Sequence, residues 1–274
     1  MAGPLVTFLT DFGMADAYVG AMKGVMLQIN PQISIVDLTH NVSPQNVLEG
    51  AFLLSTAWHY FPTATIHISV IDPGVGTDRK ALLLEGHGHL FLAPDNGLFS
   101  FVLPPDDGTS PLFQPYVARL PEGFSVYELD NPSYWRHPVS ATFHGRDIFA
   151  PVAAHLSLGV KAEEIGQPVD SITRLAVPIP HWQGDALLGH VLHIDRFGNI
   201  ITNVLAEELP AAYGGKQVEV GGTEIPGLAS SYAAGEGLVT LIGSHGYLEI
   251  ALSNGSASGL LRVSVGDEVW VGKG

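Results

Sequence analysis

The stretch Ala64-Thr-Ile-His-Ile-Ser-Val-Ile71-Asp-Pro-Gly-Val-Gly-Thr-Asp-Arg-Lys80 joins a β-branched run to a proline–glycine turn. The run is typical of a buried strand, which would end at Asp72. The proline cannot continue a strand ladder, and the two glycines permit a turn that a ligand can approach closely. Arg79 is near enough in sequence for its guanidinium to fold back over the Asp72 carboxylate. A surface turn with an ion pair would show the same pattern, so the interpretation depends on the neighbouring strands.

Two other predicted strands in the first half of the chain also lead to an aspartate. Residues 5–10 precede Asp11, and residues 33–36 precede Asp37. Apolar residues at helical spacing follow Asp16 as far as Ile29, and a second helix is predicted over residues 47–60. Ser43-Pro44 is expected to supply the N-cap and first residue of that second helix.

This alternation of strands and helices predicts a parallel sheet with right-handed crossovers. Ligands of such sheets bind outside the carboxyl ends of the strands. Because unpaired carboxylates repel one another, Asp11, Asp37 and Asp72 on one rim would indicate a functional site rather than a stabilising one.

Residues 81–140 are less regular. Residues 81–85 and 89–92 predict a strand pair, whose tip carries His87 and His89 with the spacing of a metal clip. The sequence offers no third ligand nearby, which favours an exposed hairpin tip. A further helix is predicted over residues 148–158, and His144 precedes it. The helix dipole would favour a neutral imidazole there, although a helix-entry residue bonded to backbone is an equal alternative.

A change of pattern predicts a second domain. Proline-broken segments at residues 167–170 and 177–180 are typical of a linker. Beyond Gly184 the helical spacing ends, and short apolar runs lie between glycine turns at residues 187–194, 217–220, 238–242, 247–250 and 268–271. We therefore expect an α/β class protein, with a largely parallel sheet in residues 1–180 and an antiparallel β-barrel or sandwich in residues 185–274.

Composition excludes several functional classes. The net charge is −15, with 27 acidic and 12 basic residues, which argues against nucleic-acid or anionic-membrane surfaces and suits a cationic or zwitterionic ligand. The absence of cysteine excludes thiolate metal sites and cysteine nucleophiles. There is no phosphate-loop, dinucleotide or G-x-S-x-G motif. The first residues lack a basic region before an apolar core, and no run reaches membrane-spanning length, so we expect a cytoplasmic protein.

Taken together, the motifs resemble those of the S-adenosyl-L-methionine (SAM) hydroxide adenosyltransferases, the SAM hydrolases once called DUF62, which are related to the fluorinase and chlorinase. The resemblance extends in order over nearly the whole chain. The segments that carry it are Thr10-Asp-Phe-Gly13, Asp16-Ala-Tyr-Val-Gly20, Lys23-Gly24, Asp37-Leu-Thr-His40, Asp72-Pro-Gly-Val-Gly76 with Arg79, Ala93-Pro-Asp-Asn-Gly97, Thr142-Phe-His-Gly-Arg-Asp147, Asp195-Arg-Phe-Gly-Asn199 and Asn254-Gly-Ser-Ala257.

The resemblance implies that water or hydroxide displaces methionine at C5′ of SAM and leaves adenosine. It implies that Asp72, Arg79 and His144 hold the water, and it leaves open whether Asp72 or His144 accepts the proton. SAM would be the substrate, with no separate cofactor and no metal. The resemblance also implies a homotrimer or a dimer of trimers, in which each site is shared between the N-terminal domain of one subunit and the C-terminal domain of its neighbour.

Substrate contacts carry over position by position. Asp11 matches a residue that binds both ribose hydroxyls, Asp16 and Asp195 match groups near the methionine ammonium, and Ser244 matches part of a methionine carboxylate clamp. The remaining matches are Tyr18 in the substrate site, the rings of Phe143, Phe197 and Tyr232 beside the nucleoside, and the adenine contacts Asn199 and Asn254. The position after Ser244 is arginine in the fluorinase and His245 here, which leaves the clamp open.

Two alternatives remain from the sequence. One is a SAM-dependent halogenase, although the halogenases carry a different residue at the position of Asp72 and the fluorinase carries serine at the position of Gly145. The long insertion typical of the fluorinase is also not evident. The other alternative is a non-catalytic sensor of SAM or adenosine. The sequence does not indicate which sulfonium epimer would be preferred.

Overall fold

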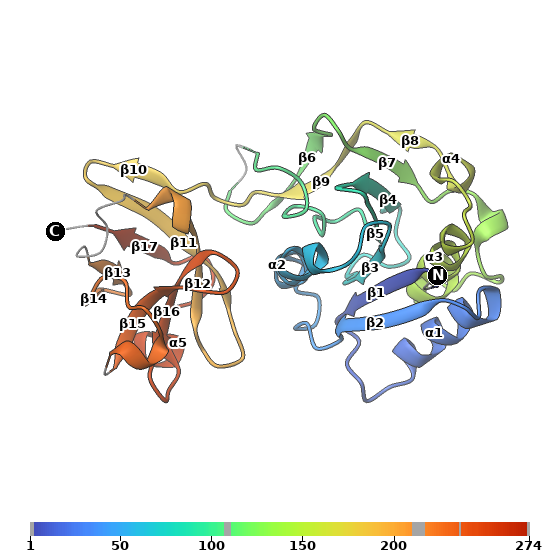
Figure 1. Cartoon of the computed structure of the whole chain (residues 1–274). Helices are drawn as coiled ribbons and strands as arrows, with labels where there is room; N and C mark the ends of the chain where they lie inside the picture. Colours follow the sequence, from blue (N-terminus) through green and yellow to red (C-terminus); the bar gives the residue numbers. More distant parts are fainter. Residues whose placement is uncertain (1–2, 107–110, 210–216, 236, 273–274) are drawn as a thin grey trace. The chain divides into compact units, whose positions relative to one another are not determined.

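The computed structural model describes residues 3–106, 111–209, 217–235 and 237–272, which form two compact units (Figure 1). Unit 1 comprises Met1–Ser110 and Gln114–Ala176, and unit 2 comprises Pro111–Phe113 and Val177–Gly274.

Unit 1 is built on a seven-stranded sheet in the order β2-β1-β3-β5-β4-β7-β8. The first four strands in this order run parallel, and β4, β7 and β8 extend the sheet in antiparallel pairs. A separate antiparallel pair is formed by β6 and β9. The bounds are β1 (Leu5–Thr10), β2 (Ser34–Thr39), β3 (Ile66–Val70), β4 (Ala81–Gly86), β5 (His89–Pro94), β6 (Pro115–Arg119), β7 (Ser125–Glu128), β8 (Pro168–Val169) and β9 (Ser171–Leu175).

Helices cover both faces of this sheet. Figure 1 shows α1 (Tyr18–Ile29) and α3 (Ala150–Ser157) on one face and α2 (Val47–Ala57) on the other. Side chains alternate along β1, so Val6 and Phe8 pack with α1 and α3, whereas Leu9 packs with α2. The sheet is therefore buried on both sides, as parallel sheets require. The shorter helical elements of this unit are η1 (Trp58–Tyr60), η2 (Pro132–Tyr134), η3 (Gly145–Phe149) and α4 (Ala162–Ile165).

Three local predictions in unit 1 are wrong. Asp37 lies inside β2 rather than beyond its end. The α2 N-cap is Asn46, whose side chain accepts the Glu49 N–H, instead of Ser43. Residues 168–169 and 171–175 are strands that pair with β7 and β6, so this proline-containing segment belongs to the fold of unit 1 and not to a linker.

Unit 2 is an antiparallel, nearly closed barrel-like sheet in the order β14-β13-β17-β11-β12-β16-β15, with β10 paired to β11 and β14 in contact with β15. The sequence predicted five of its strands and missed β10, β12 and β14. The bounds are β10 (His181–Gln183), β11 (Ala186–Ile194), β12 (Ile200–Leu205), β13 (Val218–Val220), β14 (Thr223–Ile225), β15 (Leu238–Ile242), β16 (Tyr247–Leu252), β17 (Glu268–Val271), η4 (Ala206–Glu208), η6 (Tyr232–Ala234) and α5 (Ala257–Leu261).

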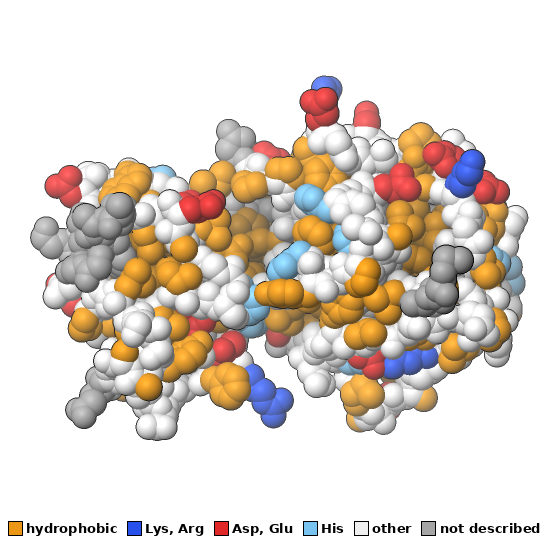
Figure 2. Space-filling model, viewed as in Figure 1, with side chains coloured by type: hydrophobic (Ala, Val, Ile, Leu, Met, Phe, Trp, Pro, Cys, Tyr) orange, Lys and Arg blue, Asp and Glu red, His pale blue; other side chains and the backbone are white. Residues whose placement is uncertain are grey.

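The surface agrees with the acidic composition. On the face shown in Figure 2, the Lys and Arg side chains are scattered and do not gather into a basic patch. Within the described residues, no helix is both long and apolar enough to cross a membrane.

Candidate active site

The loop after β3 places Asp72 against Arg79. Nε of Arg79 donates to Oδ1 of Asp72 over 2.8 Å, and Nη2 contacts Oδ2, so the guanidinium holds both carboxylate oxygens. The side chains of Asp72 and Arg79 are only 6% and 10% exposed. The strand end is fixed by Asn96, whose amide donates to the Ile71 carbonyl over 2.8 Å. Gly76 permits the return of the loop, because it has φ 79° and a Cβ there would lie 2.3 Å from the Ala141 carbonyl oxygen.

His144 joins this pair from a segment far away in sequence. Its Nδ1 lies 3.2 Å from Nη2 of Arg79. Arginine can only donate, so Nδ1 accepts and the ring proton of a neutral His144 is on Nε2. Burial and the Arg79 charge lower the pKa of His144, while Asp72 and Asp147 act in the opposite direction. The predicted neutral imidazole thus has a different main cause from the helix dipole.

Asp147 anchors the segment that carries His144. Its carboxylate is fully buried, accepts two hydrogen bonds of 2.7 Å from Arg146, and accepts the Ser140 N–H over 2.9 Å. Arg136 adds a second cation at 3.2 Å. These contacts outweigh burial and hold the pKa of Asp147 below its usual range. The predicted helix start is replaced by the π-helical turn η3, which continues into α3.

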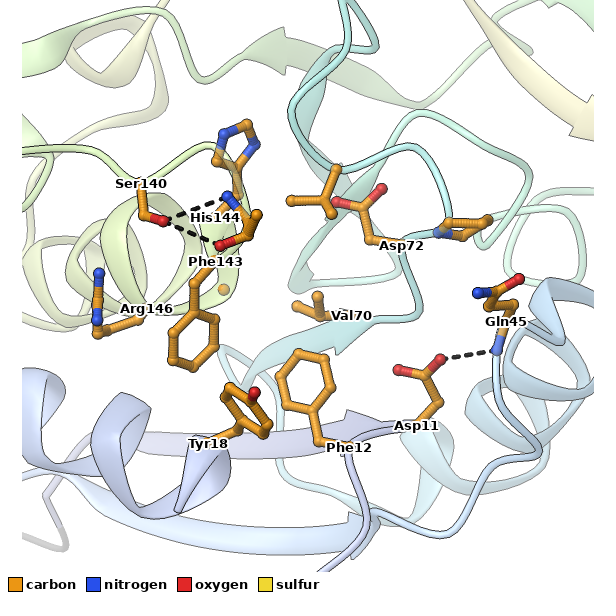
Figure 3. A pocket seen from close by; sticks show the side chains of 14 residues that line it. Asp11, Phe12, Tyr18, Gln45, Val70, Asp72, Ser140, Phe143, His144 and Arg146 are labelled. Atoms are coloured by element: carbon orange, nitrogen blue, oxygen red, sulfur yellow. Dashed lines mark hydrogen bonds between the residues drawn. The ribbon is translucent and has the colours of Figure 1, made fainter. Parts of the chain in front are cut away.

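Asp72 and His144 line a pocket of about 510 Å³ in unit 1, together with Asp11, Tyr18 and Phe143. Figure 3 shows the rings of Phe12, Tyr18 and Phe143 gathered next to one another. Their centroids lie 5.1–5.9 Å apart in edge-to-face or tilted arrangements. Oδ2 of Asp11 accepts the backbone N–H of Gln45 over 2.8 Å, which leaves Oδ1 available to a ligand.

Unit 2 has its own pocket of about 560 Å³, lined by Asp195, Phe197, Asn199, Tyr232 and Asn254 among others. Asp195 organises its loop: Oδ1 accepts the N–H groups of Phe197 and Asn199, and Oδ2 accepts the Asn199 side-chain amide, each over 2.9 Å. Because a carboxylate only accepts, this contact orients the Asn199 NH₂ towards Asp195. Oδ1 of Asn199 is left as an acceptor.

Tyr232 is held at the edge of the same pocket. Its hydroxyl donates to the buried carboxylate of Glu249 over 2.7 Å. That hydrogen bond, burial and the nearby acidic charge raise the pKa of Tyr232 to about 12. Burial raises the pKa of Glu249 as well. Phe197 exposes 77% of its surface, so its ring is available for contact.

Some sequence-predicted residues are not brought into these pockets. Asp16 and Ser244 are exposed and line neither pocket, and His245 is also exposed. Asp37 does not line the unit 1 pocket with Asp11 and Asp72; its carboxylate instead pairs with Lys23 of α1. A strand interior directs successive side chains to opposite faces, which explains why the prediction of three carboxylates on one rim fails.

The histidines of the β4–β5 hairpin are occupied by protein contacts. His87 bonds to the Val102 carbonyl and stacks on Trp58, while Nδ1 of His89 lies 3.2 Å from His67. Among the described residues, no group of three or more His, Asp or Glu side chains could hold a metal ion.

Sequence reasoning also missed residues that line the unit 1 pocket. Phe12, Gln45, Ser140, Thr142 and Arg146 contribute to its wall. Gln45 has φ 64°, a left-handed conformation that presents its N–H to Asp11. No sequence signal marks Gln45. Phe12 and Arg146, by contrast, lie inside the motifs quoted above.

Residues 6–166 match the SAM hydroxide adenosyltransferase N-terminal domain, and residues 189–270 match the corresponding C-terminal domain. The chain belongs to the SAM hydroxide adenosyltransferase family. The two matched ranges together include the residues that line both pockets.

Relatives within this family include named hydrolases. The (R)-S-adenosyl-L-methionine hydrolase of Salinispora tropica is 37% identical, over 99% of this chain and 98% of that protein. The enzyme of the same name from Thermus thermophilus is 39% identical, over 95% of this chain and 96% of its own length. A crystal structure of an uncharacterized conserved protein from Thermotoga maritima superposes with a TM-score of 0.84 at 34% identity, covering 98% of this chain and 100% of that one.

Fluorinases are also related to this chain, but at lower sequence identity than these hydrolases. That of Nocardia brasiliensis is 28% identical, over 98% of this chain and 96% of its own length.

Proposed function

We propose that this protein is an enzyme that hydrolyses SAM. In the proposed reaction, water or hydroxide attacks C5′, the C5′–S bond breaks, and adenosine and L-methionine leave. The observation that carries this proposal is the cluster of Asp72, Arg79 and His144 at the pocket of unit 1. The names of the S. tropica and T. thermophilus relatives support it. SAM is the substrate, and the proposal requires no separate cofactor.

The residues suit the chemistry of this displacement. Methionine leaves a sulfonium as a neutral thioether, so the enzyme need not protonate the leaving group. What it must supply is a water held in line with the C–S bond and an acceptor for the proton of that water. A fixed carboxylate, guanidinium and imidazole around one position provide such a preorganised environment.

Hydrogen-bond directions favour Asp72 as the proton acceptor. The lone pair of neutral His144 at Nδ1 is already occupied by Arg79. Asp72 also contacts Arg79, but each carboxylate oxygen has a second lone pair for the water. We therefore assign Asp72 as the proton acceptor. The Nε2–H of His144 is assigned to donate a hydrogen bond to the water oxygen. Arg79 contacts both side chains and holds them in place.

The substrate contacts divide between the two units. In unit 1, Asp11 is proposed to bind the ribose hydroxyls, with Tyr18 and Phe143 beside the nucleoside and Asp16 near the methionine ammonium. In unit 2, Oδ1 of Asn199 is proposed to accept from the adenine amino group, because its amide nitrogen is bound to Asp195. The further proposed contacts in unit 2 are Phe197, Tyr232 and Asn254 with the nucleoside, Asp195 with the ammonium and Ser244 with the carboxylate.

In the proposed assembly, two neighbouring subunits together complete each active site. We propose a homotrimer, alone or as a dimer of trimers, in which unit 1 of one subunit and unit 2 of the next bind the same substrate. A matched pair of variants tests this: Asp72→Asn removes the proton acceptor in unit 1, and Asn199→Ala weakens SAM binding in unit 2. After the two proteins are mixed and reassembled, about one quarter of the sites should combine both intact halves and hydrolyse SAM with the wild-type KM. If no sites with the wild-type KM appear after verified subunit exchange, the shared site is wrong.

A halogenase is the second candidate, and Gly145 argues against it. Gly145 lacks the hydroxyl that serine supplies in the fluorinase, and a Cβ at this position would lie 2.9 Å from Sδ of Met22.

The hydrolase names of the relatives also specify the (R) form, so we propose the (R)-sulfonium epimer as substrate. The net charge of −15 suits the cytoplasmic location that we propose, because a large net charge keeps a protein in solution.

One assay tests the proposal against both alternatives. Purified protein is incubated with each SAM epimer in ¹⁸O-labelled water, with chloride or fluoride present, and the products are separated by liquid chromatography and mass spectrometry. The expected result is adenosine labelled in its 5′-hydroxyl together with unlabelled methionine. A 5′-halogenated nucleoside would identify a halogenase, and binding without turnover would identify a sensor.

A further inference from the structure

A polar chain of side chains lies directly behind the Asp11 loop, although nothing in the proposed reaction uses it. Thr10, the last residue of β1, is completely buried, and its hydroxyl lies 2.8 Å from Nδ1 of His40. The same hydroxyl accepts the backbone N–H of Phe12 over 3.2 Å. His40 is itself 4% exposed and packs edge-on against Phe8.

This series of polar side chains continues to two charged residues at the surface. Nε2 of His40 lies 3.0 Å from Oδ1 of Asp37, a close contact with poorer alignment than a good hydrogen bond. Nζ of Lys23 in α1 lies 2.6 Å from Oδ2 of the same carboxylate. Burial acts to raise the pKa of Asp37, but Lys23 and His40 outweigh it and lower the pKa. Asp37 is thus kept as a carboxylate that faces Nε2.

These contacts define which group donates and which accepts at each hydrogen bond of this network. A carboxylate at Nε2 favours the ring proton on that nitrogen, so Nδ1 accepts from the Thr10 hydroxyl. The Thr10 oxygen then accepts the Phe12 N–H. Such a buried network costs free energy unless each member is satisfied, and in return it permits few alternative conformations.

The network fixes the loop that carries Asp11. The backbone N–H of Gly13 donates to the His40 carbonyl over 2.7 Å, and Gly13 has φ 66°. Asp11 therefore lies between Thr10 and Phe12, two residues whose positions depend on His40. Both Asp11 and Phe12 line the unit 1 pocket (Figure 3).

We propose that Thr10, His40 and Asp37 are positioning residues that hold the Asp11 carboxylate in the orientation that recognises both ribose hydroxyls. This inference rests on the proposed function, because it assumes a ribonucleoside in the pocket. It assigns the selection of ribose over 2′-deoxyribose to a network that does not itself contact the ligand. A carboxylate can accept from two adjacent hydroxyls only when its plane and position are fixed.

The same strand supplies a matched control. Thr7 is also completely buried in β1, and its hydroxyl lies 2.7 Å from Nδ1 of His67. That pair continues to His89 and not to the Asp11 loop. Thr10→Val and Thr7→Val therefore remove equivalent buried hydroxyls with the same change of shape, and only the first disconnects the loop.

The measurement is the ratio of the dissociation constants for 2′-deoxyadenosine and adenosine, obtained by calorimetry on the full-length protein. Wild type is expected to prefer adenosine by about 10- to 100-fold, the range for one hydrogen bond to a charged group. Thr10→Val should reduce this preference to about 3-fold or less, whereas Thr7→Val should retain it. For SAM turnover, Thr10→Val should raise KM with little change in kcat.

Two further variants distinguish loss of the hydrogen-bond network from unfolding of the protein. Thr10→Ser keeps the hydroxyl and should retain the wild-type preference. His40→Phe preserves the ring packing against Phe8 but has no Nδ1, so it should lose the preference as Thr10→Val does. The inference is overturned if Thr10→Val and His40→Phe fold and discriminate like wild type, or if wild type hydrolyses SAM without preferring adenosine. A wild type that neither binds adenosine nor hydrolyses SAM would instead overturn the proposed function.

Discussion

Replacing Asp72 by asparagine should reduce both stability and activity, by amounts that can be separated. The carboxylate and its partner guanidinium expose only 6% and 10% of their side chains. Asparagine keeps the shape but leaves Arg79 as a buried cation without a counterion. Breaking a buried ion pair in this way costs about 3–5 kcal/mol of the free energy of unfolding.

A second substitution isolates the catalytic part. The double variant Asp72→Asn, Arg79→Gln removes both charges, so most of the lost stability should return. Turnover should stay about 10²- to 10⁴-fold below wild type, because the proton acceptor is still missing. In activation free energy this loss corresponds to about 3–5 kcal/mol.

An exposed ion pair next to the site serves as the control. Lys80 and Glu128 lie 2.8 Å apart, with 45% and 32% of their side chains exposed. Lys80→Gln should cost at most about 1 kcal/mol and leave turnover unchanged. Urea unfolding supplies the free energies, and single-turnover release of adenosine from SAM supplies the rates. If the double variant regains activity along with stability, Asp72 acts only as a structural partner of Arg79 and the proposed role is wrong.

Two further predictions concern the other unit and the response to pH. Asn199→Ala should weaken the binding of SAM and of adenosine alike, by about 3- to 10-fold, and leave kcat unchanged. Wild type should also bind inosine more weakly than adenosine. Calorimetry that finds no change in affinity for Asn199→Ala would contradict the adenine contact. Burial, together with His89, lowers the pKa of His67 to about 3. The unfolded chain therefore binds more protons below about pH 6.5, so stability should fall as the pH decreases from there, by about 2–3 kcal/mol at pH 4.5 from this group. Urea unfolding of His67→Phe between pH 7 and 4.5 should show a flatter pH dependence than wild type, and an equal slope would refute the assignment.

Local sequence pattern predicted five of the seven strands in the sheet of unit 1, β1 to β5, but not β7 or β8. The prediction of β1 over residues 5–10 is confirmed, and α1 ends at Ile29 as expected. Hydrophobic periodicity and proline–glycine turns act over a few residues, so they are visible in the chain itself. The contact between Asp72 and Arg79 could be predicted for the same reason, because only a short loop separates them.

Tertiary structure decided what the sequence left open or misassigned. His144 reaches Arg79 across 65 residues, and the position of its proton follows from that contact. Asp37 shares the strand-end pattern of Asp11, yet α1 and His40 take up its carboxylate and keep it out of the pocket. Whether the oxygen or the nitrogen of the Asn199 amide is left for a ligand likewise depends on Asp195. The sequence alone therefore determined β1 to β5, α1, α2 and many residue types of the site, because those depend on neighbouring residues. Orientation and protonation depend on partners that only the folded chain brings within hydrogen-bond distance.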